Sequence, residues 1–275
     1  MPEGPEIRKA ADQVEKALKD RTVLDLHFAF PHLQDYEDVL KGQKVTKVDT
    51  KGKAMLIQFT NDYTIYSHNQ LYGKWYVRNA YNYPKTNRQL RLAIHNENKS
   101  ALLYSASDIE VLRNYEVDHH PFIAKIGPDL LSEPITADAL AARFKSDRFR
   151  RRRWTALLLD QAFIAGIGNY LRSEILFVAG IHPEIRPMDC TPVQLEKAAK
   201  ASIELMWRSY EHKGITNDLE LAERLKAQGE KRWQYRHWVF NRGGEPCRIC
   251  GTEIVKFRAA SRRCYFCPSC QSKEE

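Results

Sequence analysis

The chain has 275 residues, with 43 Lys or Arg against 35 Asp or Glu, so its formal net charge is +8. A hydrophobic content of 43% with 28% charged residues is typical of a globular protein and excludes wholesale disorder. Because no apolar run approaches the roughly 18 residues of a membrane span and no signal-peptide pattern opens the chain, we expect a soluble intracellular protein without a membrane partner.

The first part of the chain predicts a β-sandwich that begins with a helix. Residues 1–20 favour the helix, because Pro5 suits a first helical turn and apolar residues recur at helical spacing from Ile7 to Leu18. Segments rich in β-branched and aromatic residues follow at 22–30, 44–49, 54–60, 63–68, 74–77, 89–95 and 100–105. Short strands separated by turns of this kind indicate a β-sandwich domain over residues 1–130.

After residue 130 the pattern becomes helical. Thr136 and Thr191 are suitable N-caps, and the expected helices cover 137–144, 155–163, 170–179 and 192–208. Residues 209–240 read as further helix followed by a basic linker rich in aromatic residues. This part predicts a second, helical domain over residues 131–240.

Four of the six cysteines form two Cys-x-x-Cys pairs, Cys247 with Cys250 and Cys267 with Cys270, separated by sixteen residues. This spacing is typical of a zinc ribbon, in which two tight turns each present two thiolates to one tetrahedral ion. Two disulfides are the alternative, but a reducing cytosol disfavours them. Cys264 overlaps the second pair and is expected to be a spare thiol. The sequence therefore predicts an α+β protein whose residues 241–275 hold one structural zinc ion.

The positive charge is concentrated in two windows that also carry aromatic residues. Residues 144–154 hold six basic residues against one acidic, and residues 231–263 hold nine against two. Solvated charged faces are one interpretation, but two concentrated patches with interleaved aromatic side chains favour a polyanionic partner such as nucleic acid.

The N-terminus could carry chemistry of its own. Small residues after Met1 allow its removal, which leaves Pro2 as a free secondary amine. Such an amine titrates near pH 8 and condenses with an aldehyde carbon to an iminium, while Glu3 beside it could move protons. On chemistry alone, a proline that merely opens a helix is the better interpretation.

Three loops carry weaker signals. Lys53 follows Gly52 in a sharp turn between two strands, where its ammonium could reach a phosphate. Residues 68–73 place polar, apolar and aromatic side chains at a strand end, as a wedge into a base stack would require. The Gly-x-Gly-Asn turn ending at Asn169 offers backbone N–H groups at a helix start. Alone, the turn at Lys53 is more often an ordinary solvated turn, and composition does not separate a wedge from a packed hairpin turn at 68–73. At the Gly-x-Gly-Asn turn, a helix–turn–helix without nucleic acid is the alternative, but the neighbouring run of four arginines at 150–153 favours phosphate binding.

Together these residues resemble the endonuclease VIII and formamidopyrimidine-DNA glycosylase family, from Pro2 to Cys270. The motifs that carry the resemblance are Pro-Glu-Gly-Pro-Glu at 2–6, Lys-Gly-Lys-Ala at 51–54, Ser-His-Asn-Gln-Leu-Tyr-Gly at 67–73, Leu-Tyr-Ser-Ala-Ser-Asp-Ile-Glu at 103–110, Leu-Leu-Leu-Asp-Gln-Ala-Phe at 157–163, Gly-x-Gly-Asn-Tyr-Leu-Arg at 166–172 and Gly-Glu-Pro-Cys at 244–247. The resemblance makes Pro2 the favoured nucleophile.

The resemblance implies a bifunctional DNA glycosylase and AP lyase of base excision repair that acts on oxidised pyrimidines. It implies that Pro2 attacks C1′ of the damaged nucleoside, with Glu3 as the acid that assists ring opening. Lys53 matches a proton donor and phosphate contact, and Arg262 matches an arginine of the ribbon hairpin that grips phosphate during δ-elimination.

The same resemblance implies how the DNA is held. Gln70, Leu71 and Tyr72 match the side chains that fill the space left by an extruded nucleotide. Asn169 matches a phosphate contact in a helix–two-turn–helix motif. Lys125 stands where close relatives have Arg, so its charge is kept but bidentate phosphate geometry is not.

We accordingly expect damaged double-stranded DNA as the partner, a monomer, and a cytoplasmic, nucleoid-associated bacterial protein. An enzyme of the same family for oxidised purines such as 8-oxoguanine is one alternative. A non-catalytic zinc-ribbon DNA-binding protein is the other.

Overall fold

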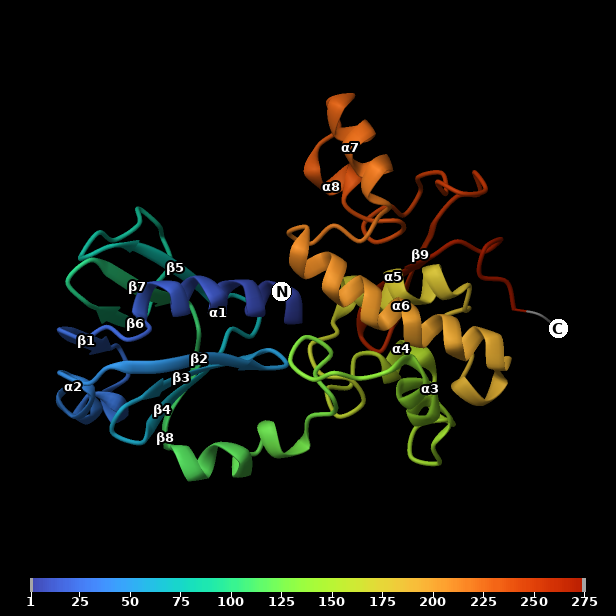
Figure 1. Ribbon diagram of the computed structural model, residues 1–275. Coiled ribbons are helices and arrows are strands. Elements are labelled where there is room, and N and C mark those ends of the chain that lie inside the picture. Colours follow the sequence, from blue (N-terminus) through green and yellow to red (C-terminus); the bar gives the residue numbers. More distant parts are fainter. Residues whose placement is uncertain (1, 274–275) are drawn as a thin grey trace. The chain divides into compact units, whose positions relative to one another are not determined.

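The computed structural model describes residues 2–273 and divides into two compact units, Met1–Ile126 and Gly127–Glu275 (Figure 1). Each unit has its own buried core, and each is described here by itself. The α+β class expected from the sequence is confirmed: the first unit contains two β-sheets, and the second contains helices and a cysteine-bearing hairpin.

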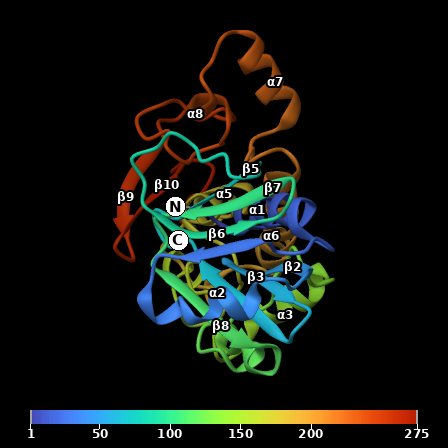
Figure 2. The same cartoon turned by 90° about the vertical axis from the view of Figure 1, so that its left-hand side faces the viewer.

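The first unit is a sandwich of two four-stranded antiparallel sheets, with strand orders β2-β3-β4-β8 and β1-β6-β7-β5 (Figure 2). The strands of the first sheet are β2 (Val45–Lys51), β3 (Ala54–Phe59), β4 (Tyr63–His68) and β8 (Asp108–Arg113). Those of the second are β1 (Asp25–Phe28), β5 (Lys74–Asn79), β6 (Leu90–His95) and β7 (Lys99–Tyr104). Strand β8 is absent from the sequence-based prediction, because its polar positions include Asp108 and Glu110, residue types that are depleted in strands.

Helix α1 (Gly4–Leu18) packs against strands of both sheets. Its apolar stripe, including Ile7, Val14 and Leu18, is almost completely buried in the sandwich core. Short helices complete the unit: η1 (Pro31–Leu33), α2 (Asp35–Leu40), η2 (Asn114–His119) and η3 (Ile123–Lys125). Because α1 is fixed along its whole length, the residues that precede it are held at a defined end of the sandwich.

The second unit is built around helices α5 (Asn169–Ala179) and α6 (Pro192–Glu211), which pack against each other. The remaining helices are α3 (Ala137–Lys145), α4 (Trp154–Leu157), η4 (Pro187–Asp189), α7 (Leu219–Ala227) and α8 (Arg232–Tyr235). Thr136 and Thr191 cap α3 and α6 through their hydroxyl groups, as their positions in the sequence suggested.

One helix is much shorter than its sequence pattern indicates. Residues 155–163 were expected to be helical, but α4 ends at Leu157. Two polar side chains take over the backbone hydrogen bonds: Asp160 accepts from the Ala162 N–H, and Gln161 accepts from the Gly166 N–H while donating to the Ile167 carbonyl. The segment therefore becomes a compact series of turns that leads into α5.

The C-terminal hairpin consists of β9 (Val255–Ala259) and β10 (Arg262–Phe266), which are antiparallel. Strand β10 packs against α5, so the hairpin belongs to the second unit. The residues between the two Cys-x-x-Cys pairs predict a hairpin with strands at 252–257 and 263–266, and the observed strands are shifted relative to these bounds. Ala260 and Ser261 form the two-residue turn, and both have positive φ angles, 50° and 61°. A two-residue turn with positive φ at both positions has a backbone twist that fits the right-handed twist of the two strands it joins.

Among the residues that the structure describes, no helix combines the length and the apolar character needed to cross a lipid bilayer.

Candidate active site and nucleic-acid interface

The N-terminal residues are placed by the start of helix α1. Glu3 is the N-cap residue, and its backbone N–H donates to the Glu6 carboxylate at 3.0 Å. Glu3 is only 2% exposed, which is unusual for a carboxylate, whereas Pro2 keeps partial exposure. The structure therefore presents the backbone nitrogen of Pro2 at the head of α1, next to a buried carboxylate.

Lys53 lies in the tight turn between β2 and β3. Lys51 pairs with Ala54 across the hairpin, and Gly52 takes a left-handed φ of 60°, which glycine adopts without steric cost. Lys53 is 6% exposed, although a lysine on such a turn would ordinarily be solvated. Helix α1 packs on both strands of this hairpin. The sequence prediction of a turn is correct, and burial distinguishes Lys53 from an ordinary surface cation.

His68, at the end of β4, is an additional titratable group whose role the sequence does not indicate. It pairs with Ala54 across the sheet. Burial, and then the charge of Lys53, lower the pKa of His68 to about 4. The imidazole is therefore neutral near pH 7, and its Nδ1 accepts the backbone N–H of Gln70 at 3.0 Å. His68 thus connects the surroundings of Lys53 to the loop that follows.

That loop carries the predicted wedge. Gln70 is exposed, and Leu71 and Tyr72 are 54% and 66% exposed, which is high for large apolar side chains. Single exposed apolar residues are common, but here two large ones follow each other on one loop. Lys125 is exposed at the end of η3, the last helix of the first unit.

In the second unit, Asn169 is the first residue of α5 and follows Gly168 at the N-cap. Its side-chain oxygen accepts from the guanidinium of Arg172 at 2.7 Å. Arg172 is completely buried and also donates to the carbonyls of Thr155 at 2.8 Å and Arg263 at 2.9 Å. Arg172 therefore fixes both Asn169 and the hairpin backbone.

Arg262 is exposed and begins β10, directly after the turn with positive φ angles. Because Arg172 also donates to the Ala259 carbonyl at 3.3 Å, it holds the hairpin on both sides of Arg262. Asn169 and Arg262 are thus joined through one buried guanidinium. In the sequence, Arg172 is visible only as one of two charged residues in the otherwise mostly apolar α5.

A buried carboxylate on α5 binds the backbone of the segment that leads to the C-terminal hairpin. Glu174 has no solvent exposure and accepts four hydrogen bonds, from the Thr216 hydroxyl and from the backbone N–H groups of Trp238, Val239 and Phe240, at 2.6 to 2.9 Å. Burial raises the pKa of Glu174, and these hydrogen bonds oppose that shift. His237 contacts the same hydroxyl at 2.8 Å. Sequence reasoning missed this set entirely.

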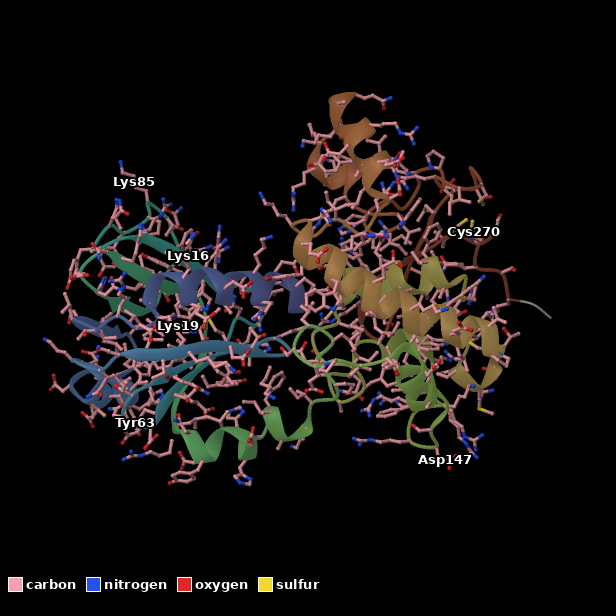
Figure 3. The ribbon with its side chains drawn as sticks, in the orientation of Figure 1. Lys16, Lys19, Tyr63, Lys85, Asp147 and Cys270 are labelled. Carbon is pink, nitrogen blue, oxygen red and sulfur yellow. The ribbon has the colours of Figure 1, made fainter. Side chains whose placement is uncertain are left out.

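The four predicted cysteine ligands come together. Their Sγ atoms all lie within 4.8 Å of one another, with 3.4 Å between Cys250 and Cys267 and 3.9 Å between Cys247 and Cys270. A tetrahedral zinc ion with Zn–S bonds of ~2.3 Å requires sulfur separations of about 3.8 Å, so the thiolates fit one ion. Cys270 is labelled in Figure 3. The site is a structural zinc site, since its four corners are all supplied by the protein.

One neighbouring residue, Gln271, fastens the zinc site to the helical part of the second unit. Gln271 is buried, accepts the Cys267 N–H at 2.9 Å and donates to the Ile181 carbonyl at 2.8 Å, just beyond α5. Cys264 is not part of the ligand cluster: it is buried beside Ser173, with 3.8 Å between Sγ and Oγ. The expectation that Cys264 is a spare thiol agrees with this position.

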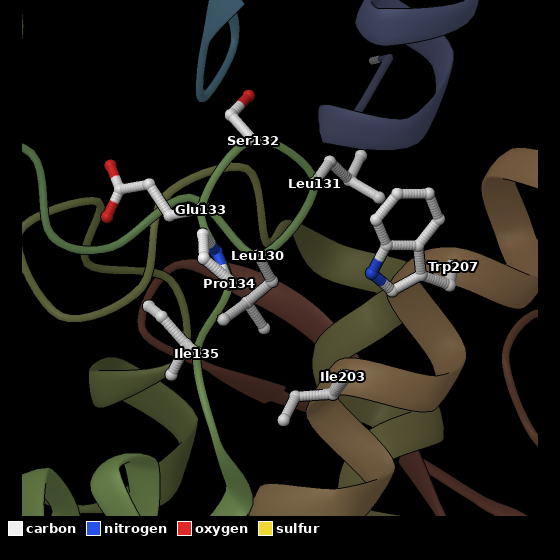
Figure 4. Close-up of a pocket in the computed structure, with 8 residues that line it drawn as sticks. All are labelled: Leu130, Leu131, Ser132, Glu133, Pro134, Ile135, Ile203 and Trp207. Carbon is white, nitrogen blue, oxygen red and sulfur yellow. The ribbon is translucent and has the colours of Figure 1, made fainter.

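The second unit also contains a pocket of about 340 Å³ between residues 130–135 and helix α6 (Figure 4). Leu131, Ile203 and Trp207 give it a largely apolar wall. None of the residues predicted from the sequence to act in catalysis or DNA binding lines it, so the chemistry described above lies elsewhere.

The site residues therefore form two sets, one in each unit. In the first unit, the head of α1 carries the Pro2 nitrogen and the buried Glu3 carboxylate. The β2–β3 turn carries the buried Lys53 ammonium, and β4 ends at His68. In the second, one guanidinium links Asn169 to the hairpin of Arg262, beside a zinc site. Such a combination defines a zinc-ribbon protein whose N-terminal residues lie beside a buried carboxylate.

Comparisons with known proteins identify the family. Residues 1–107 match the formamidopyrimidine-DNA glycosylase N-terminal domain, residues 126–220 the formamidopyrimidine-DNA glycosylase H2TH domain, and residues 244–273 the zinc finger found in formamidopyrimidine-DNA glycosylase and isoleucyl-tRNA synthetase. Endonuclease 8 of Shigella sonnei strain Ss046 is 45% identical over 271 residues, and that of Escherichia coli O9:H4 strain HS is 46% identical. Both alignments cover 98% of this chain and all of the relative.

Solved structures share the fold. Lactococcus lactis formamidopyrimidine-DNA glycosylase, bound non-covalently to DNA with an AP site, superposes with a TM-score of 0.81 at 21% identity, covering 98% of this chain and 100% of that chain. The chain belongs to the endonuclease VIII and formamidopyrimidine-DNA glycosylase family. It is therefore a DNA glycosylase and AP lyase of base excision repair, as the sequence motifs predicted.

Proposed function

We propose that this enzyme excises oxidised pyrimidines of the thymine-glycol type from double-stranded DNA and then cleaves the strand by β,δ-elimination. The observation that carries the proposal is the N-terminus, where the Pro2 nitrogen precedes a helix whose N-cap carboxylate, Glu3, is buried. The similarity to two proteins named Endonuclease 8 supports the choice of substrate.

In the proposed reaction, the Pro2 amine attacks C1′ of the damaged nucleoside. The N–C1′ bond forms, the glycosidic bond breaks, and the base leaves with a proton. Glu3 protonates the ring oxygen of the sugar, which opens the ring and yields an iminium.

The iminium withdraws electrons from C2′, so that a C2′ proton is lost and the 3′ phosphate leaves in β-elimination. A second elimination expels the 5′ phosphate. Lys53 is the proposed proton donor and phosphate contact, and Arg262 is the proposed phosphate ligand during the second elimination. A guanidinium suits this task, because its planar donors match two phosphate oxygens at once.

The proposed DNA contacts divide into a wedge and a set of phosphate ligands. Gln70, Leu71 and Tyr72 occupy the space of the extruded nucleotide, and the exposure of Leu71 and Tyr72 fits that task. Asn169 and Lys125 contact the phosphate backbone. Since these contacts are ionic or polar, affinity for undamaged duplex falls steeply as salt rises.

We further propose a monomer that works in the bacterial cytoplasm, bound to the nucleoid through DNA. The proposed division of the chain remains three domains, at 1–130, 131–240 and 241–275, with the last two packed into one unit.

A cleavage assay on matched duplexes tests the substrate. Thymine glycol and 8-oxoguanine are placed in the same sequence, and the products are resolved with 3′ and 5′ labels. The proposal predicts preferential nicking at thymine glycol with phosphate on both sides of the gap. Preferential nicking at 8-oxoguanine would instead establish the oxidised-purine alternative, for which the fold shared with MutM in complex with DNA containing carbocyclic 8-oxo-G is the supporting observation. Binding without nicking would support a non-catalytic protein.

A further inference from the structure

The loop that carries the proposed wedge has a shape imposed by its own backbone. Gln70 has a positive φ of 48°, and the Gly73 N–H donates to the Asn69 carbonyl at 2.7 Å. A Cβ atom on Gly73 would lie 2.6 Å from the Asn69 Cα and from its carbonyl oxygen, so only glycine fits there. The loop is therefore a tight turn that pushes Leu71 and Tyr72 outward.

Side chains outside the turn fasten it at two places. On the Gln70 side, the Ser107 hydroxyl donates to the Gln70 side-chain oxygen at 2.7 Å, in addition to the bond between the Gln70 N–H and His68. On the Tyr72 side, the guanidinium Nη1 of Arg88 donates to the Tyr72 carbonyl. Arg88 comes from the segment between β5 and β6, so a different part of the sandwich holds the far end of the turn.

We propose that Arg88 is a positioning residue for the wedge: it orients the Tyr72 peptide so that Leu71 and Tyr72 are presented for insertion into the base stack. This inference rests on the proposed function, because it assigns Arg88 to the extrusion step of that reaction. The contact is to a carbonyl, so it constrains backbone orientation without neutralising the charge of Arg88.

The physical advantage is preorganisation. Leu71 and Tyr72 are exposed, and an unfastened turn would sample many orientations of them. Inserting the wedge would then cost the entropy of ordering the loop in addition to the cost of unstacking the DNA. A planar guanidinium with fixed donor directions limits the carbonyl to one orientation, which the flexible ammonium of lysine does not do.

If Arg88 positions the wedge, replacing it should affect extrusion of the damaged nucleotide rather than the bond-breaking steps. The variants are Arg88→Ala and Arg88→Lys, with Lys85→Ala as the matched control, because Lys85 is an exposed cation of the same segment (Figure 3). Single-turnover cleavage is measured on a thymine-glycol duplex with 2-aminopurine beside the lesion. We expect Arg88→Ala to slow both unstacking and cleavage about three- to tenfold, the range for one exposed hydrogen bond. Arg88→Lys recovers only part of the rate, and Lys85→Ala matches the parent.

A second substrate separates positioning from a local loss of structure. In a single-stranded oligonucleotide with the same lesion there is no pair to break, so Arg88→Ala should cleave it at the parental rate. An equal loss on both substrates would overturn the proposal, as would an unchanged rate on the duplex. In a Tyr72→Ala background, Arg88→Ala should have little further effect, and full additivity would also contradict the proposal.

Salt dependence distinguishes positioning from direct phosphate binding by Arg88. A lost phosphate contact lowers the slope of log affinity against log salt by about 0.9. The proposal predicts an unchanged slope for Arg88→Ala, and a reduced slope would overturn it.

If the parent protein itself fails to cleave any lesion duplex, the proposed function fails. If the parent cleaves and Arg88→Ala cleaves equally well, only the assignment of Arg88 fails.

Discussion

The substitution Glu174→Gln tests whether the buried carboxylate fastens α5 to the segment that leads into the zinc site. The glutamate has no exposure, and each of its oxygens accepts two hydrogen bonds. Glutamine has the same shape but replaces one acceptor with an NH₂ group. Whichever way the amide is placed, the NH₂ group then faces groups that donate hydrogen bonds.

The cost depends on that placement. If the NH₂ group faces Val239 and Phe240, two buried backbone N–H groups lose their acceptor. If it faces Thr216 and Trp238, the hydroxyl can turn to accept, and only the Trp238 N–H is orphaned. Each orphaned buried donor costs about 1–3 kcal/mol. The amide takes the cheaper placement, with one orphaned donor, so the expected loss in the free energy of unfolding is about 1–3 kcal/mol.

Urea unfolding of the parent and of Glu174→Gln measures this loss, and zinc release detected with a chromogenic chelator reports on the nearby site. Glu204→Gln is the control, because Glu204 lies on α6 with its side chain 55% exposed in a pair with Arg208. A surface pair of this kind contributes about 0–1 kcal/mol. A loss below about 1 kcal/mol for Glu174→Gln, or one equal to that of the control, would refute this reasoning.

Three further predictions address other parts of the molecule. Cys267→Ala removes a zinc ligand, so DNA binding and cleavage should fall together at least tenfold while the first unit stays folded; retained cleavage by the zinc-free variant would disprove this. Burial and Lys53 lower the pKa of His68 to about 4, whereas the unfolded chain titrates near 6.5. Because the unfolded chain binds more protons between these values, the stability of the first unit should fall as pH drops from about 6.5 to 4, and His68→Gln should flatten that slope in urea titrations. Gly73→Ala should open the wedge turn and lower cleavage of lesion duplexes about tenfold, since overpacking of this kind costs about 1–3 kcal/mol; parental cleavage rates would contradict the clash.

Much of the fold is predictable because it follows from local chemistry. Periodicity identifies α1 and α6, Thr191 marks the start of α6, and Gly52 marks a sharp turn. The zinc ligands follow from cysteine spacing alone, because two Cys-x-x-Cys turns leave few other arrangements.

The features that escaped prediction depend on contacts between distant residues. Arg172 and Glu174 are charged residues on a helix, and sequence alone places such residues in solvent. The structure buries both, and carbonyl, hydroxyl and N–H groups from segments some 40 to 90 residues away form hydrogen bonds with them. The expected helix over 155–163 fails for a similar reason, since Asp160 and Gln161 bond to the turn that follows. Local propensity contains none of this information.

The central claim is that the Pro2 amine is the nucleophile of a DNA lyase, and trapping with borohydride tests it most directly. Reduction during the reaction converts the iminium to a stable amine and joins the protein to a thymine-glycol duplex. We expect a cross-link for the mature protein, located by mass spectrometry on Pro2, and at least a hundredfold less for a chain extended by residues before Pro2. An extended chain that cross-links as well as the parent, or a cross-link on a lysine, would contradict it.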